Sequence, residues 1–439
     1  MTDRDKAEQL FRSAVEVVKP AQLMQDNLAI NNDELMIAGH TIPLTSFKKL
    51  YVIGAGKAAA AMAVAAESIL KNHISDGIVT TKNGHGLPTK KIQVIEAAHP
   101  VPDEQGMEAV KQTLRLLEKV THNDIVICLI SGGASALWCD VPPGITLPEI
   151  QATFDQLIRS GAGIHEVNTV RKHLSGIKGG QLVRYCNRAR VFSLIISDVP
   201  GDDLAAIASG PTVADPSTFQ DAYAILSRYN LLPILPQSIR QYIEKGKEGV
   251  ITETPKPGDL IFKSTINKII GNNRIAVEAA AQQAAAMGYH THLIPQLIIG
   301  DAAEEAKKLV ASALNYKGPK PVCIIQGGET TVKVTGKGKG GRNQHFVLAA
   351  LNELNTIQDK SEYDICILSG GTDGTDGPTD ATGAVIGRST LMQVANLKLD
   401  IKTYLENQDA YHFLQRTNSL IITGPTQTNV MDLMMAIVP

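Results

Sequence analysis

The alternation of apolar runs with helical patterns restricts the fold of this 439-residue chain more than any other feature. In the first half, the apolar run 49–53 turns into an alanine-rich helical segment at 58–70, and another apolar run spans 124–131. The second half repeats the pattern, from a predicted strand at 268–271 to a last one at 420–423. Apolar strands that alternate with helices are typical of an α/β fold with a largely parallel sheet.

The chain is long enough for two or three domains, and one change in composition marks a boundary. Near residue 255 the sequence becomes rich in proline and glycine, as TETPKPGD. We therefore predict an N-terminal domain over 1–255 and a C-terminal domain over 256–439.

Charge and composition argue against two classes of partner. The chain has 42 basic and 44 acidic side chains, a net charge of −2, and only 4% aromatic residues. These values predict no binding to nucleic acid or to an anionic membrane. No apolar run reaches the ~18 residues that span a bilayer, and the N-terminal pattern is that of a mixed-charge helix, not of a signal peptide. The five scattered cysteines, without CxxC spacing, fit a reducing cytoplasm.

Glycine-rich or polar turns follow several of the predicted strands. Ligands of open α/β sheets bind beyond the carboxyl ends of the strands, which is where these turns lie. Because basic and acidic residues are mixed in the turns, they predict a shared site for a polyanion and a metal ion. The five turns begin at Gly54, Ser131, Ser197, Gly327 and Gly370.

The longest glycine-rich stretch, 327–343 (GGETTVKVTGKGKGGRN), runs into a helical pattern. A glycine loop at a helix start exposes backbone N–H groups and the positive end of the helix dipole, and both bind phosphate or carboxylate. The stretch is not a P-loop, because Arg342 and Asn343 stand where Lys and Ser/Thr are required. We predict that Gly327, Gly328 and Asn343 contribute to an anion site; a flexible hairpin is the alternative.

The first turn carries a dinucleotide-like pattern. Gly54, Gly56 and Ala59 satisfy G-x-G-x-x-A, but the next strand ends at Lys82 without the acidic residue that binds the ribose of NAD. Lys57, directly after the second glycine, suits an anion better. We expect the turn Ser131-Gly132-Gly133-Ala134-Ser135 to hold nucleotide phosphates.

Carboxylates in the turns supply oxygen ligands of the kind that Mg²⁺ takes. We choose Asp198, Glu329 and Asp373 as metal ligands; ordinary turn or cap residues are the alternative for each. A basic segment, 168–180, adds Arg171 and Lys178, for which a phosphate-facing role and a solvated helix face are both open.

The motifs, taken together, resemble the MOFRL-type (class II) glycerate 2-kinases. The resemblance covers most of the chain, from Lys49 to TGPTQTNVMDL near the C-terminus. Some members of that family carry the name hydroxypyruvate reductase. The motifs occur in the order VIGAGKAAAAMA, HPVPDEQG, ISGGASAL, NTVRKHLSGIKGG, SDVPGDDLAAIASGPTV, GGETTV…GKGGRNQ and SGGTDGTDGPTDATGA.

The resemblance implies an N-terminal Rossmann-like three-layer α/β/α domain and a C-terminal α/β domain with a mixed sheet, with the active site in the cleft between them. It implies transfer of the γ-phosphoryl group of ATP to the 2-hydroxyl of D-glycerate with Mg²⁺. The motif lysine and arginine that matter for activity in the family are Lys57 and Arg342 here. The oligomeric state stays open, with a homodimer as one option.

These expectations combine into one set of site residues. Arg342 would clamp the glycerate carboxylate or the γ-phosphate, and Lys57 would neutralise charge on the transferred group. Asp198 would accept the hydroxyl proton or hold Mg²⁺. The residues predicted to bind the nucleotide are Gly54, Gly56, Ser131, Gly132, Gly133, Ser135, Lys178, Gly327, Gly328 and Asn343.

Two other functions remain as alternatives. An NAD(P)-dependent hydroxypyruvate reductase is favoured by G-x-G-x-x-A and disfavoured by the missing ribose acid. A non-catalytic protein that binds phosphate ligands would need the anion loops but not the carboxylates.

Overall fold

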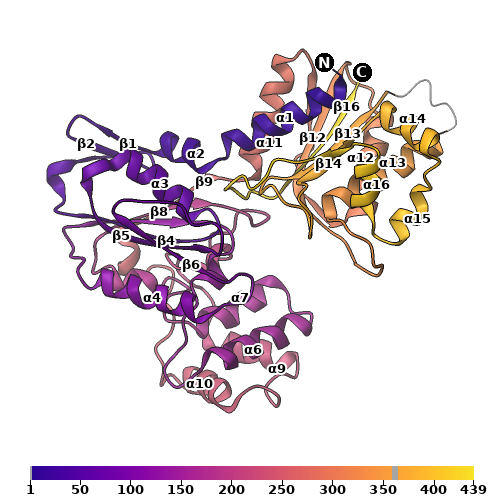
Figure 1. Cartoon of the computed structure of the whole chain (residues 1–439). Coiled ribbons are helices and arrows are strands. Elements are labelled where there is room, and N and C mark those ends of the chain that lie inside the picture. Colours follow the sequence, from indigo (N-terminus) through magenta and orange to yellow (C-terminus); the bar gives the residue numbers. More distant parts are fainter. Residues whose placement is uncertain (1, 358–363) are drawn as a thin grey trace. The chain divides into compact units, whose positions relative to one another are not determined.

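The computed structural model describes residues 2–357 and 364–439, which form two compact units (Figure 1). The N-terminal unit is Leu23–Ile270, and the C-terminal unit consists of Gly271–Pro439 together with the chain up to Gln22. This division differs from the predicted one in two ways. The first helix belongs with the C-terminal unit, and residues 256–270 stay with the N-terminal unit because they carry its last strand.

The N-terminal unit is built on a six-stranded sheet whose order is β6-β5-β4-β7-β8-β9. Counted from β4, this order is 3-2-1-4-5-6, the strand order of Rossmann folds. The pairs from β6 to β8 are parallel, as the apolar runs predicted. The strands are β4 (Leu50–Ala55), β5 (Ile74–Lys82), β6 (Ile92–Ala97), β7 (Ile125–Ile130), β8 (Arg190–Ile196) and β9 (Thr265–Gly271).

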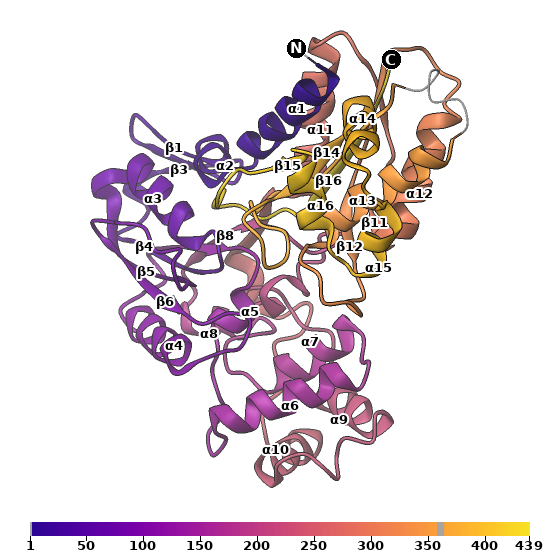
Figure 2. The ribbon, with the colours of Figure 1, turned by 45° about the vertical axis from the view of Figure 1, so that its right-hand side comes forward.

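Helices and a small antiparallel sheet complete the N-terminal unit. The strands β4 and β7 are buried along their whole length, which explains their unbroken apolar sequences. Four helices, α6, α7, α9 and α10, gather around an apolar core of their own (Figure 2). The elements are α2 (Pro20–Asn27), β1 (Leu28–Asn31), β2 (Glu34–Ile37), β3 (His40–Pro43), α3 (Ala59–Leu70), α4 (Glu104–Leu117), α5 (Ala134–Leu137), α6 (Leu147–Arg159), α7 (Ile164–His173), α8 (Leu182–Tyr185), α9 (Phe219–Arg228) and α10 (Gln237–Lys247).

The C-terminal unit contains a mixed seven-stranded sheet of order β10-β12-β16-β13-β14-β15, with β11 also paired to β12. The β10 and β11 pairings with β12 are parallel and the others are antiparallel, so the predicted α/β class with a mixed second sheet is confirmed. The strands are β10 (His290–Leu293), β11 (Ile298–Asp301), β12 (Val322–Thr331), β13 (Cys366–Gly371), β14 (Gly383–Ile386), β15 (Leu420–Ile421) and β16 (Asp432–Val438).

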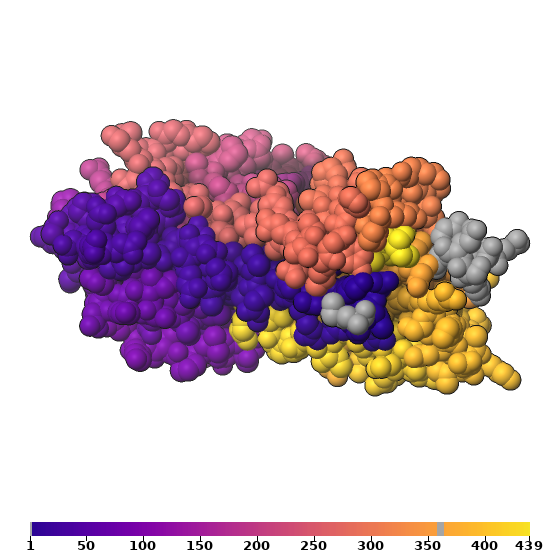
Figure 3. All heavy atoms as spheres, turned by 90° about the horizontal axis from the view of Figure 1, so that it is seen from above, coloured from indigo at the N-terminus to yellow at the C-terminus, as the bar shows by residue number. Residues whose placement is uncertain are grey.

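The helices of the C-terminal unit bury their apolar faces against this sheet and each other. Helix α1, at the start of the chain, packs against α11, and Figure 3 shows their atoms side by side in indigo and salmon. No helix among residues 2–357 and 364–439 is both long enough and apolar enough to cross a membrane. The helices are α1 (Asp3–Val17), α11 (Asn273–Ala286), α12 (Ala302–Leu314), α13 (Arg342–Thr356), α14 (Arg388–Leu397), α15 (Ile401–Glu406) and α16 (Ala410–Arg416).

Candidate active site

The turns after β4 and β7 meet at the point where the strand order of the N-terminal sheet reverses. The backbone N–H of Lys57 donates to the carbonyl oxygen of Gly132 over 2.9 Å. The N–H of Ala58 donates to the Ser131 hydroxyl over 3.0 Å. Ligands of open α/β sheets bind at such a switch point, so the fold places these two predicted turns where a ligand site is expected.

The glycines of these turns allow close approach between neighbouring segments. A Cβ atom on Gly56, whose φ is +137°, would lie 2.1 Å from the Ser131 hydroxyl oxygen. A Cβ atom on Gly132 would lie 1.8 Å from Oδ2 of Asp198, at the end of β8. A Cβ atom on Gly54 would lie 2.3 Å from the backbone carbonyl oxygen of Leu129. The two turns and the Asp198 carboxylate therefore fit together only because glycine occupies these positions.

Lys57 and His99 both adjoin the turn at Gly133. A Cβ atom on Gly133 would be 3.0 Å from the His99 ring and 3.4 Å from Cγ of Lys57. Among the residues that the structure describes, the Lys57 ammonium forms no ion pair or hydrogen bond. Burial, helped by the charges of Lys57 and Lys82, lowers the pKa of His99 to about 4, so its ring is neutral at pH 7.

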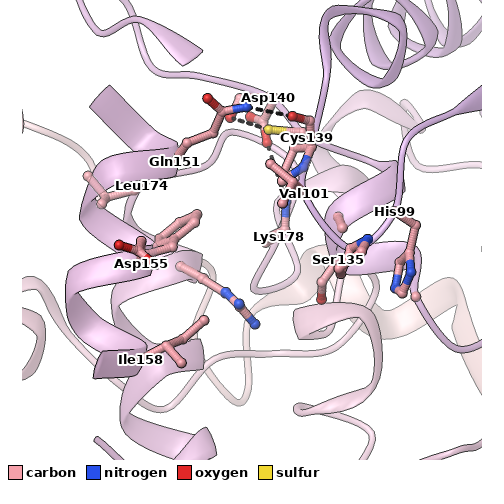
Figure 4. A pocket seen from close by; sticks show the side chains of 16 residues that line it. His99, Val101, Ser135, Cys139, Asp140, Gln151, Asp155, Ile158, Leu174 and Lys178 are labelled. Atoms are coloured by element: carbon pink, nitrogen blue, oxygen red, sulfur yellow. Dashed lines mark hydrogen bonds and ion pairs between the residues drawn. The ribbon is translucent and has the colours of Figure 1, made fainter. Parts of the chain in front are cut away.

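A cavity of about 350 Å³ adjoins this turn and is shared by Gly133, Ser135 and Lys178 (Figure 4). The buried ammonium of Lys178 donates to the carbonyl oxygen of Trp138 over 2.7 Å and lies 3.8 Å from the Asp140 carboxylate. The Ser135 hydroxyl is 2.9 Å from that of Ser209. Lys178 thus lines the cavity, but its charge is already matched by Asp140.

In the C-terminal unit, Arg342 joins two carboxylates. Asp432, at the start of β16, is paired in register with Gly328 of β12 and Gly371 of β13. Arg342 donates from Nε and Nη2 to the Asp432 oxygens, and its Nη1 lies 3.0 Å from Glu329. Burial opposes this charge, but the Asp432 hydrogen bonds raise the pKa of Arg342. The Arg342 guanidinium, which we predict to clamp a substrate, therefore binds a carboxylate of the chain itself.

The helix start predicted to bind an anion is capped by the carboxylate of Asp376. The backbone N–H groups of Asn343 and Gln344 donate to Asp376 over 3.1 and 2.8 Å. The fully buried Asn343 side chain also accepts a hydrogen bond from Ser369 over 2.6 Å. An internal carboxylate therefore lies at the N-terminus of α13, the position that the sequence predicts for a ligand phosphate.

The stretch predicted as one long glycine loop begins as a strand. Gly327, Gly328 and Glu329 belong to β12, and Gly328 pairs with β11 and with β16. A Cβ atom on Gly327 would lie 1.6 Å from the Asn273 side chain, so the packing of Asn273 explains why glycine occupies this position. The loop that follows donates backbone N–H groups to the segment between α15 and α16, from Gly338 to the Asn407 carbonyl for example.

The predicted metal ligands are divided between the two units: Asp198 belongs to the N-terminal unit, whereas Glu329 and Asp373 belong to the C-terminal unit, where both lie near Asp432. Asp198 adjoins Gly132, Glu329 binds Arg342, and Asp373 accepts the N–H of Thr375 over 3.1 Å in a local turn. Within the described parts of the chain, no three His, Cys, Asp or Glu side chains form a group that could hold a metal ion. A kinase Mg²⁺ takes only one or two carboxylates along with phosphate oxygens, so this role of Asp198, Glu329 and Asp373 stays a prediction.

The structure brings most predicted residues into two groups, one in each unit. The first holds the strand-end turns with Asp198 and, on the adjoining cavity, Ser135 and Lys178. The second holds Gly327, Gly328, Glu329 and Arg342 around Asp432, a residue that the sequence analysis did not single out.

These features define an α/β protein with a Rossmann-order unit and a second unit with a mixed sheet. Comparison with known proteins then identifies the family. Residues 6–244 match the family described as a domain of unknown function (DUF4147), and residues 322–432 match the MOFRL family. The chain belongs to this DUF4147/MOFRL family, as its motifs predicted.

Three relatives show how far the similarity extends. The glycerate 2-kinase of Pyrococcus horikoshii is 39% identical, over 100% of this chain and 98% of the relative. The crystal structure of a glycerate kinase from Thermotoga maritima superimposes with a TM-score of 0.87 at 35% identity, over 99% of both chains. A protein of Agrobacterium vitis, provisionally named a hydroxypyruvate reductase, is 37% identical over 93% of this chain and 91% of its own.

Proposed function

We propose that the protein transfers the γ-phosphoryl group of ATP to the 2-hydroxyl of D-glycerate, giving 2-phosphoglycerate and ADP with Mg²⁺. The observation that carries this proposal is the meeting of Lys57, the Gly132-Gly133 turn and Asp198 at the switch point of a Rossmann-order sheet. Full-length similarity to proteins named glycerate kinases supports the same activity.

Phosphoryl transfer needs positioning and charge neutralisation more than covalent chemistry from the protein. The oxygen on C2 forms the new bond to the γ-phosphorus, the bond from that phosphorus to ADP breaks, and the hydroxyl proton goes to Asp198. Lys57, whose ammonium has no ion-pair partner in the described part of the chain, supplies a positive charge beside the turn, where it would stabilise charge on the transferred group. The glycine turns would bind phosphate oxygens through backbone N–H groups.

In the alternative assignment Asp198 would hold Mg²⁺ and would not take the proton, because a kinase metal takes a carboxylate together with phosphate oxygens. When bound, the metal ion would neutralise phosphate charge. Glu329 and Asp373 are the further candidate ligands, on the C-terminal unit. For Arg342 we propose an electrostatic contribution at longer range, since Nε and Nη2 already donate to Asp432 and Nη1 lies 3.0 Å from Glu329.

A hydroxypyruvate reductase is the second candidate, because the strand order is that of dinucleotide-binding folds. The strand that would supply the ribose-binding acid is β5, which ends Thr80-Thr81-Lys82. That ending lacks a carboxylate for the ribose hydroxyls and favours the kinase.

The test is ³¹P NMR of the purified protein with ATP, Mg²⁺ and D-glycerate, repeated with EDTA. We expect a 2-phosphoglycerate signal that EDTA abolishes. A 3-phosphoglycerate signal would overturn the position of transfer. No transfer, with NADH oxidised in the presence of hydroxypyruvate, would establish the reductase instead.

Size-exclusion chromatography with light scattering tests the homodimer, and fractionation of cells tests the cytoplasmic location that the free, buried cysteines fit.

A further inference from the structure

Arg171, near the C-terminal end of α7, is a cation on the cavity wall that has no anionic partner among the described residues. Its guanidinium carbon lies 5.3 Å from the centre of the Phe154 ring, and both residues line the cavity. Across residues 2–357 and 364–439, its side chain forms no ion pair or hydrogen bond. Its neighbour Lys172, in contrast, is paired with the buried Asp215 over 3.3 Å.

Arg171 is half-buried, and a charge that has lost part of its hydration is stabilised by an anionic ligand. Removal of the guanidinium from water lowers the pKa of Arg171, although an arginine remains charged at neutral pH. An aromatic face returns only part of the lost hydration energy. The cavity therefore holds a partly desolvated cation that an incoming anion would stabilise.

The other charged groups on the cavity wall are already compensated. Asp140 accepts hydrogen bonds from the Ser175 hydroxyl and the Gly176 N–H and lies near Lys178. Asp155 is bound by Arg159 over 2.8 Å. His99 is neutral, so Arg171 leaves the cavity with one uncompensated positive charge. One carboxylate matches that charge, whereas a triphosphate would bring several negative charges near Asp140 and Asp155.

The cavity connects Arg171 to the turn beside Lys57. Figure 4 shows His99 and Ser135 on one wall and Asp155, Ile158 and Leu174 on the wall opposite, and Gly133 belongs to the same lining. A short hydroxy acid in this cavity would have its carboxylate near Arg171 and its hydroxyl toward the Gly133 turn.

We propose that Arg171 binds the carboxylate of the hydroxy-acid substrate in this cavity, through the two parallel hydrogen bonds that a guanidinium gives a carboxylate. The inference rests on the proposed function for the identity of the substrate. It makes Arg171 a determinant of specificity for acids over their neutral analogues.

The test measures binding without turnover. D-glycerate, its neutral amide and a non-hydrolysable ATP analogue are titrated separately by calorimetry into the wild type, Arg171→Lys and Arg171→Leu. Hydrogen bonds to a charged group contribute about 1.5–3 kcal/mol, which corresponds to roughly 10- to 150-fold in affinity. We expect D-glycerate to bind Arg171→Leu weaker by about that factor, and Arg171→Lys to lie between. The preference of the wild type for the acid over the amide should disappear in Arg171→Leu, while the ATP analogue binds unchanged.

Controls separate this inference from folding and from the proposed reaction. Arg171→Leu removes an unpaired cation, so its melting temperature should equal or exceed that of the wild type. The matched variant Arg115→Leu removes an exposed arginine on α4 and should bind as the wild type does. The inference is overturned if Arg171→Leu keeps its affinity for D-glycerate, or if it loses affinity for the nucleotide instead. It is also overturned if the wild type binds neither D-glycerate nor its amide. A wild type that binds glycerate without transferring phosphate overturns the proposed function alone.

Discussion

Arg342 and Asp432 form a two-point ion pair, from Nε to Oδ2 at 2.6 Å and from Nη2 to Oδ1 at 2.9 Å. The arginine begins α13 and the aspartate begins β16, so the pair ties a helix start to the central strand of the sheet. The Asp432 side chain is 0% exposed and that of Arg342 is 31% exposed. Loss of the arginine would therefore leave a carboxylate buried without its main partner.

Arg342→Met should lower the free energy of unfolding by about 3–5 kcal/mol, the usual cost of breaking a buried pair from one side. Urea unfolding followed by circular dichroism measures this. The double variant Arg342→Met/Asp432→Asn should recover part of the loss, because it removes the stranded charge. Arg416→Met, which removes an exposed arginine on α16, serves as control. A loss below about 1 kcal/mol in Arg342→Met would contradict a structural role for the pair.

Lys57→Met should lower kcat by ~10² with little change in melting temperature, since the side chain has no partner in the described structure and would act only on developing charge. Steady-state kinetics with ATP and D-glycerate, beside a thermal melt, give both values. Lys111→Met, on the exposed face of α4, should match the wild type in both. Near-normal kcat in a folded Lys57→Met protein would remove Lys57 from the proposed mechanism.

Gly132→Ala should inactivate the enzyme by moving Asp198, because the new Cβ would lie 1.8 Å from Oδ2 of that carboxylate. We expect kcat/KM to fall by at least ~10², comparable to the loss of one transition-state contact. Gly163→Ala is the matched control, since its Cβ would meet only Glu166 at 3.7 Å. If Gly132→Ala kept its activity, the place of Asp198 in the proposed mechanism would be wrong.

The sequence predicted elements wherever the signal was local. The apolar run at 124–131 forms β7, Ile125–Ile130, and the Ala-rich helix at 58–70 is α3. Strand β16, with Asp432 at its start, was not predicted, because its pairing with β12 and β13 depends on segments distant in the sequence. Without β16 in place, nothing in the sequence brought Asp432 to Arg342.

Glycine-rich segments did not by themselves distinguish a ligand-binding turn from a tightly packed strand. At Gly56 and Gly132 they mark close approach between turns, as the ligand-site hypothesis requires, but at Gly327 and Gly328 they mark packing inside a strand. Sheet pairing with β11 and β16 overrides the low strand preference of glycine there. The alternative left open for aspartates, that they cap helices, describes Asp376, but its partner Asn343 lies 33 residues away and could not be identified beforehand.

Asp376 should give the C-terminal unit a pH-dependent stability. Burial raises its pKa to about 6, against the lowering effect of the N–H groups of Gln344 and Asn343. The folded state therefore holds this proton more tightly than the unfolded chain, whose Asp pKa is 3.8. The stabilisation from protonation is present below about pH 4 and is lost as the pH rises through about 6.

Asp376→Asn removes this titration, so the free energy of unfolding of the wild type minus that of the variant should fall as the pH rises from about 4 to 6, with little change above 7. The amide also replaces one acceptor of the helix cap, which costs about 1 kcal/mol independently of pH. The free energy of unfolding of both proteins is measured by urea unfolding at a series of pH values. The test is how the difference between them changes with pH, and not its constant part. Asp373→Asn removes a carboxylate from the same loop without touching the α13 cap, so a similar slope in that variant would contradict the assignment to Asp376.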